Sequence, residues 1–210
     1  MAAIPCRNTA LLVIDMQRAF FDNRYSIGAA GGDVTPLRAA IPGTLHLLRL
    51  ARGAGVPVIF TRYVYAPGMV DFERRGGPRA ERRRAGNSLG HGTEEVELIP
   101  ELAQRPEEVV IDKARPSAFY ATRLEPVLHG MDIRNLVICG VTTNICVEST
   151  ARDAGQRDYG TYVVRDAVAE FTPERNHYAL MGIGWMFGDV VDLADVEAAW
   201  SAPEHDRPGA

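Results

Sequence analysis

The sequence predicts an α/β protein in which a six-stranded, mainly parallel sheet is covered by helices on both faces. Short runs rich in β-branched residues alternate with longer helical patterns along the chain. Such alternation is typical of parallel sheets with crossover helices. Most of the short runs are also continuously apolar, without the alternation of a half-exposed strand, as expected of strands buried on both faces.

Each element follows from a local pattern. The apolar runs predict strands at residues 10–15, 56–62, 108–113, 135–140, 161–166 and 189–193. Amphipathic patterns predict helices at residues 36–55, 121–130, 144–160 and 173–188. Gly55 is a plausible C-cap for the first helix, and Pro173 is a normal first residue for the last.

Composition narrows the class of protein. The chain has 210 residues, which favours one domain spanning 1–210, and its net charge of −4 argues against nucleic acid or an anionic membrane as a partner. We find no signal peptide, and no apolar stretch approaches the roughly 18 residues of a membrane span. Three widely spaced cysteines predict neither a disulfide framework nor a zinc site, so we expect a cytoplasmic protein. Residues 1–8 and 201–210 are expected to be loose.

Two long connections, residues 20–36 and 65–92, interrupt the strand–helix rhythm. Connections of this length are often functional lids. The arginine-rich segment 74–84 in the second could meet an anionic substrate, although we favour a solvated surface or a subunit contact. His91 lies in the same connection, and no pair of histidines in the chain has the spacing of a metal site, so we expect no cofactor or metal.

Candidate catalytic residues follow three of the predicted strands. In an open α/β sheet, ligands bind beyond the carboxyl ends of the strands. Asp15, Lys113 and Cys146 lie at or just after such ends. Alone, Asp15 would be interpreted as a strand-end carboxylate satisfied by backbone donors, and Lys113 as a lysine reaching solvent. Their occurrence together with Cys146 favours catalysis.

Cys146 is the best candidate for a nucleophile. It lies in the first turn of a predicted helix, where unpaired N–H groups and the helix dipole stabilise a thiolate, and a neighbouring Lys113 would add to this. Asp15 could accept the thiol proton and later deliver it to a leaving amine. Cys139 lies within an apolar strand and is interpreted as a buried hydrophobe, and Cys6 has no obvious partner.

Three motifs, "LLVIDMQ", "DKARPSAF" and "GVTTNICVESTARDA", resemble those of the isochorismatase-like cysteine hydrolases, in the family's order and over roughly residues 9–196. The resemblance implies a three-layer Rossmann-like fold and a catalytic triad of Asp15, Lys113 and Cys146. It also implies a cis peptide bond between Val141 and Thr142. The backbone N–H groups of Thr142 and Cys146 would then form an oxyanion hole.

The resemblance also suggests a reaction class. Segments of the chain are similar to ureidoacrylate amidohydrolases, biuret hydrolases and N-carbamoylsarcosine amidases, which implies hydrolysis of a small linear carbamoyl or ureido amide. Nicotinamidases of the family bind a metal through a histidine motif after the second strand, and "TRYVYAPG" has no histidine. Phe20, Phe119 and Tyr120 are candidates for the pocket wall, with core packing an equal alternative for Phe119 and Tyr120.

Other functions stay open at this point. An isochorismatase-type vinyl ether hydrolase would not need the cysteine, and a binding protein could retain the scaffold without turnover. A nucleotide-binding Rossmann module is disfavoured because no Gly-x-Gly-x-x-Gly follows a strand. Relatives are commonly oligomeric, so a homodimer or homotetramer is expected, and "GWMFG" should place large apolar side chains near a surface.

Overall fold

The computed structural model describes residues 4–74 and 76–201 and contains one six-stranded sheet. Its strands run in the spatial order β3-β2-β1-β4-β5-β6, and every neighbouring pair is parallel. The strands are β1 Thr9–Ile14, β2 Val58–Tyr63, β3 Val109–Lys113, β4 Asn135–Val141, β5 Gly160–Ala169 and β6 Asp189–Val191. The predicted sheet is therefore confirmed, and it is wholly parallel.

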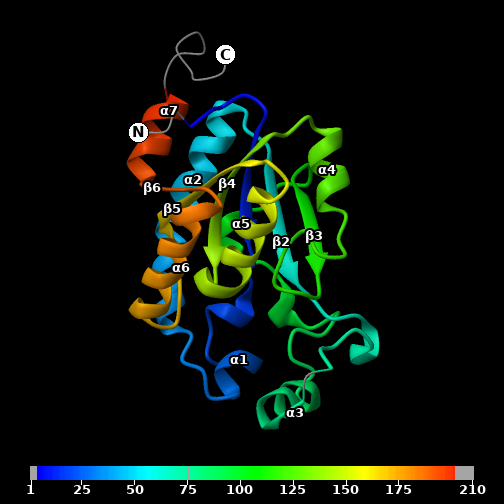
Figure 1. Ribbon diagram of the computed structural model, residues 1–210. Helices are drawn as coiled ribbons and strands as arrows, with labels where there is room; N and C mark the ends of the chain where they lie inside the picture. The colour runs from blue at the N-terminus through cyan, green and yellow to red at the C-terminus, as the bar shows by residue number, and fades with distance from the viewer. Residues whose placement is uncertain (1–3, 75, 202–210) are drawn as a thin grey trace.

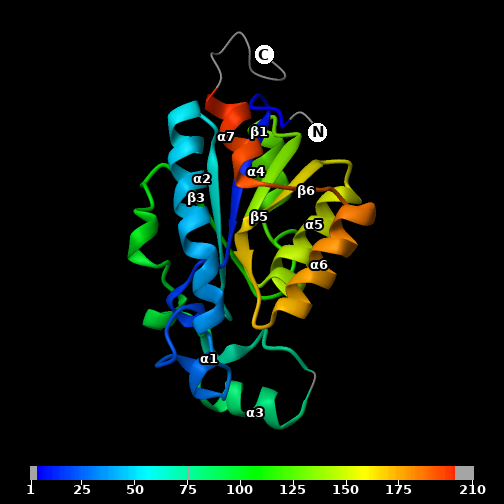
Figure 2. The same cartoon turned by 90° about the vertical axis from the view of Figure 1, so that its left-hand side faces the viewer.

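Helices cover both faces of this sheet, as predicted (Figures 1 and 2). One face carries α2 and α7, and the other carries α4, α5 and α6. Two further helices, α1 and α3, lie beyond the carboxyl ends of the strands. The bounds of the helices are α1 Ser26–Ala29, α2 Ala40–Ala54, α3 Pro78–Ala85, α4 Leu124–Gly130, α5 Glu148–Gly155, α6 Pro173–Met186 and α7 Leu193–Ser201. No helix within the described ranges is long and apolar enough to cross a membrane.

The predicted helix ends have the expected local chemistry. Gly55 follows α2 with a left-handed φ of 72°, and its N–H group bonds the carbonyl of Ala51. Pro173 opens α6, and the Thr172 hydroxyl accepts a hydrogen bond from the Arg175 N–H group. These are the glycine C-cap and the proline start that the sequence predicts, and the structure adds the Thr172 cap.

The structure corrects the sequence-based description in three places. The connections 20–36 and 65–92 are not structureless, because they contain α1 and α3. The start of the third predicted helix is a π-helical turn, Thr143–Val147, before α5 begins. Ile4 is buried in the core and Asn8 bonds Asp132, so residues 4–8 are held in place rather than loose. Residues 1–3 and 202–210, to which the same expectation applied, lie outside the described ranges.

Large apolar side chains reach the surface along α6, as the sequence indicates. Trp185 is 87% exposed, and it shares the outer part of this helix with Tyr178, Met181 and Met186. Nearly all of the buried apolar side chains belong to one contiguous core.

Gly140 allows the sheet to close tightly beside the predicted site. Its φ of 112° favours glycine, and a β-carbon built there would lie 2.1 Å from the carbonyl oxygen of Ile14. Ile14 directly precedes Asp15, so this glycine sets how closely β4 approaches the end of β1.

We therefore expect Gly140→Ala to lower the free energy of unfolding by about 3 kcal/mol, since both the φ value and the close contact oppose a side chain. Urea denaturation measures this change. Gly130→Ala is the matched control, because a β-carbon at Gly130, the last residue of α4, meets no atom within 4 Å. A Gly140→Ala protein as stable as Gly130→Ala would contradict this account of the contact.

Candidate active site

The structure brings Asp15, Lys113 and Cys146 together at the carboxyl edge of the sheet. Lys113 Nζ lies 2.6 Å from Asp15 Oδ2, and both side chains are fully buried. Both of them act electrostatically on the Cys146 thiol. It is itself only 4% exposed. The three residues that the sequence singles out thus form one buried cluster.

Strand order explains why these residue types meet. Asp15 follows β1 and Cys146 lies in the turn after β4, and these strands are neighbours at the point where the chain reverses its direction across the sheet. Lys113 ends β3, which is separated from β1 by β2. Only a long side chain can cross that intervening strand, which accounts for a lysine at this position.

Two residues of β2 contact the Lys113 and Asp15 side chains where they meet. The Thr61 hydroxyl donates to Asp15 Oδ1 at 2.6 Å and accepts from the Asp15 N–H group at 3.1 Å. Lys113 Nζ lies 4.5 Å from the ring centre of Tyr63. The sequence reasoning missed both residues, although a Thr and a Tyr two positions apart at the end of a buried apolar run share one face and could have indicated them.

A threonine also fixes the loop after Lys113 to the helix that carries the cysteine. The Thr150 hydroxyl donates to the Cys146 carbonyl at 2.7 Å and accepts from the Ala118 N–H group at 3.0 Å. On the same loop, Ser117 donates to Asp153 of α5. These bonds hold Lys113 and Cys146 in place relative to each other, although the two residues are far apart in the sequence.

The turn before Cys146 has an unusual backbone. The peptide bond between Val141 and Thr142 is cis. Thr142 is 4% exposed, and its carbonyl accepts hydrogen bonds from the N–H groups of Ile145 and Val147. The buried carboxylate of Glu170 accepts from the N–H group of Asn144 at 3.1 Å. Thr142 and Cys146 therefore lie at the two ends of one short, closely bonded turn.

Comparisons with known proteins agree with this architecture. Residues 9–195 match the isochorismatase domain. The chain belongs to the isochorismatase family. It is 32% identical to the ureidoacrylate amidohydrolase RutB of Azorhizobium caulinodans, with 95% of this chain and 93% of the relative covered. The corresponding protein of Stutzerimonas stutzeri is 35% identical, with 96% and 87% covered.

Solved structures of the isochorismatase family have the same fold. A cysteine hydrolase from Pseudomonas syringae pv. phaseolicola superposes with a TM-score of 0.80 at 29% identity, covering 94% of this chain and 96% of the other. An N-carbamoylsarcosine amidase from Thermoplasma acidophilum superposes with a TM-score of 0.67 at 26% identity, covering 88% and 96%. The family that the three sequence motifs resemble is thus confirmed.

Burial dominates the electrostatics of the Cys146 thiol. It raises the pKa of this thiol to about 12; Lys113 opposes this effect and Asp15 adds to it. Burial lowers the pKa of Lys113, but its interactions with Asp15 and Cys146 outweigh burial and leave this pKa raised. The sequence reasoning counted the lysine and the helix end, which favour a thiolate, but not the loss of water, which favours the neutral thiol.

A neutral thiol beside an ion pair is nevertheless suited to nucleophilic chemistry. Loss of the thiol proton to bulk water would leave one uncompensated negative charge in a buried site, which is costly. Transfer of the same proton to Asp15 leaves the total charge of the cluster unchanged. The arrangement thus disfavours a free thiolate and allows the thiol to ionise when Asp15 receives its proton.

The other predicted pocket residues are dispersed. Phe20 is buried beside the end of β1. The ring of Phe119 lies 5.7 Å from that of Tyr159 and 4.9 Å from the guanidinium of Arg157, near the C-terminal end of α5. Tyr120 is 62% exposed. None of these contacts brings Phe119 or Tyr120 to the cluster, so for Phe119 the packing alternative has the stronger support.

His91 and Cys139 have different surroundings. His91 is exposed, and it borders a cavity of about 330 Å³ that Lys113 of the cluster also lines, together with Asp71 and Asp112. Cys139 is fully buried, and burial raises its pKa to about 12, as expected of a thiol that packs in the core. Within the described ranges, no group of three or more His, Cys, Asp or Glu side chains could hold a metal ion.

We expect absorbance titration near 240 nm to find the resting Cys146 thiol neutral at about pH 8, with about one molecule in ten thousand ionised. Asp15→Asn should lower the thiol pKa, because the Asp15 carboxylate is one of the groups that raise it. Lys113→Met should raise the pKa further, because the ammonium is the group that lowers it. Each variant is compared with the same variant that also carries Cys146→Ser, so that the absorbance of the tyrosines can be subtracted. Shifts of the same sign in both variants would contradict this assignment of the charges.

Proposed function

We propose that the protein is a cysteine-dependent amidohydrolase that cleaves a C–N bond of a small linear amide, most consistent with a carbamoyl or ureido compound. The buried Asp15–Lys113 ion pair, which acts electrostatically on the Cys146 thiol, carries the proposal. Ureidoacrylate amidohydrolases at 32–35% identity over nearly the full chain support the substrate class.

In the proposed reaction, the Cys146 sulfur attacks the carbonyl carbon of the substrate while the thiol proton passes to Asp15. The N–H groups of Thr142 and Cys146 would hold the developing oxyanion. As the tetrahedral intermediate collapses, Asp15 returns the proton to the leaving nitrogen, and ammonia or an amine departs from a thioester. Lys113 stays charged throughout and compensates the negative charge, whichever atom carries it.

Water completes the cycle. Asp15 accepts a proton from the attacking water, and the oxygen adds to the thioester carbon. The sulfur then leaves and regains the proton, which restores the neutral thiol beside the ion pair. Each step conserves the total charge of the buried cluster, so the low dielectric that raises the thiol pKa does not oppose turnover.

A screen for ammonia release tests the proposal. The panel contains biuret, ureidoacrylate, N-carbamoyl amino acids, nicotinamide and simple aliphatic amides. We expect release from at least one carbamoyl or ureido compound, and Cys146→Ser should lower kcat at least about 10³-fold because the nucleophile is lost. Cys6→Ala is the matched control, since this thiol lies outside the cluster, and should leave the rate unchanged.

Isochorismate in the same panel separates the alternatives. Activity on isochorismate that survives Cys146→Ser would favour vinyl ether hydrolysis. A folded wild-type protein that turns over none of the compounds would favour a binding protein on the same scaffold. Either result would overturn the amidohydrolase proposal.

A further inference from the structure

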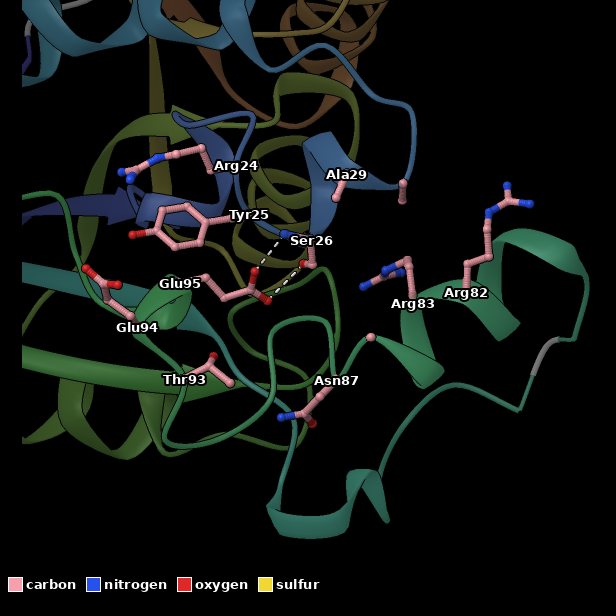
Figure 3. A pocket seen from close by; sticks show the side chains of 12 residues that line it. Arg24, Tyr25, Ser26, Ala29, Arg82, Arg83, Asn87, Thr93, Glu94 and Glu95 are labelled. Atoms are coloured by element: carbon pink, nitrogen blue, oxygen red, sulfur yellow. Dashed lines mark hydrogen bonds between the residues drawn. The ribbon is translucent and has the colours of Figure 1, made fainter.

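The arginine-rich segment contains one side chain that turns back toward the body of the protein. Helix α3 carries Arg82, Arg83 and Arg84 beyond the carboxyl edge of the sheet (Figure 1). The Arg83 side chain is only 19% exposed. It borders a cavity of about 430 Å³ that residues from α1 and from the segment around Glu95 also line, and Figure 3 shows Arg83 extending toward Ser26 while Arg82 points away.

Aromatic rings hold Arg83 in this position. Its guanidinium carbon lies 5.9 Å from the ring centre of Tyr65 and 5.6 Å from that of Phe72. One of its nitrogens lies 3.2 Å from a carboxylate oxygen of the half-exposed Glu73. A guanidinium has five N–H donors, so this single contact leaves most of them available for a ligand.

The same aromatic residues connect Arg83 to the catalytic cluster. The Tyr65 hydroxyl donates to the Tyr63 hydroxyl at 3.3 Å, and their ring centres lie 5.3 Å apart. The Lys113 ammonium lies over the other ring of this pair, Tyr63. Burial raises the pKa of the Tyr63 hydroxyl; Cys146 adds to this, and Arg83 acts in the opposite direction. A chain of contacts from Arg83 through Tyr65 and Tyr63 thus reaches the Lys113 ammonium.

The carboxylates around the cavity are already satisfied. Glu95 is buried, and its oxygens accept from the Ser26 N–H group, the Ser26 hydroxyl and the Leu89 N–H group. Glu94 pairs with Arg18. Both carboxylates thus bond to groups other than Arg83, whose own ion pair is with Glu73.

We propose that Arg83 binds the carboxylate of an anionic substrate whose ureido or carbamoyl carbon lies at Cys146. This inference rests on the proposed function and adds a specificity-determining residue on α3 to it. A guanidinium that stacks on aromatic rings keeps its N–H donors in a fixed, forked arrangement. Two of these donors can bind both oxygens of a carboxylate, which an ammonium group does less well. Tyr63 and Tyr65 would lie along the substrate between the two charged ends.

A matched pair of substrates tests the proposal. 3-Ureidopropionate carries the carboxylate, and its methyl ester has the same ureido group without the charge. Arg83→Gln should lower kcat/KM for the acid roughly 10- to 100-fold, mainly through KM, because a charge-assisted bond is lost. The value for the ester should stay within about twofold of wild type.

Two further variants separate this role from folding and from net charge. Arg83→Lys keeps the charge but loses the fork, so its loss on the acid should be smaller than that of Arg83→Gln. Arg79→Gln removes the same charge from the exposed first turn of α3, outside the cavity lining, and should change neither substrate. Thermal unfolding of each variant checks that α3 is retained.

The outcomes are distinguishable. Equal losses on acid and ester in Arg83→Gln would overturn the proposal and indicate a structural role for Arg83. Ammonia release from neutral amides, but from no carboxylate-bearing compound, would overturn the proposal and leave the proposed function standing. No ammonia release from any compound would overturn both.

Discussion

The buried ion pair between Asp15 and Lys113 is the constraint on which the site depends. Both side chains are removed from water, and their charged atoms lie 2.6 Å apart. Removing one partner from a buried pair leaves an uncompensated charge and typically costs about 3–5 kcal/mol, whereas the intact pair adds little to stability. Such a pair is better explained by chemistry than by folding. Its two opposite charges allow a proton to move between sulfur and carboxylate without a change in net charge.

The topology of the sheet determines which residues can form this ion pair. Parallel strands place the ends of β1, β3 and β4 on one edge of the sheet, and the strand order leaves β2 between the lysine and the aspartate. Thr61 on that strand orients Asp15, and Gly140 lets β4 approach the backbone just before Asp15. The site is therefore assembled by sheet topology, and α1, α3 and their connections lie beyond it.

Much of this arrangement could be predicted from the sequence. Continuous apolar runs predicted the strands, and charged residues at their carboxyl ends predicted the positions of Asp15 and Lys113. The supporting residues could not be predicted so readily, because the partners of Thr61 and Thr150 are distant in sequence. The order of the strands in the sheet also cannot be deduced from any local sequence pattern. The effect of burial on Cys146 was not counted for a related reason, since the loss of water around a thiol depends on the packing of the whole edge.

The end of the site that is proposed to bind the substrate carboxylate shows the same limit. Arginine content alone favoured an exposed surface for residues 74–84, and most of α3 is indeed exposed. Only the three-dimensional structure separates Arg83 from its neighbours, by its contacts with Tyr65 and Glu73.

The central claim is that Asp15 carries the proton, so that ionisation of the thiol is not enough by itself. Single-turnover ammonia release by Asp15→Asn, at a pH where its thiol is ionised, tests this most directly. The account predicts release at least about 10³-fold slower than in the wild-type protein, despite the larger thiolate fraction, because no group returns a proton to the leaving nitrogen. Release at or above the wild-type rate would contradict it.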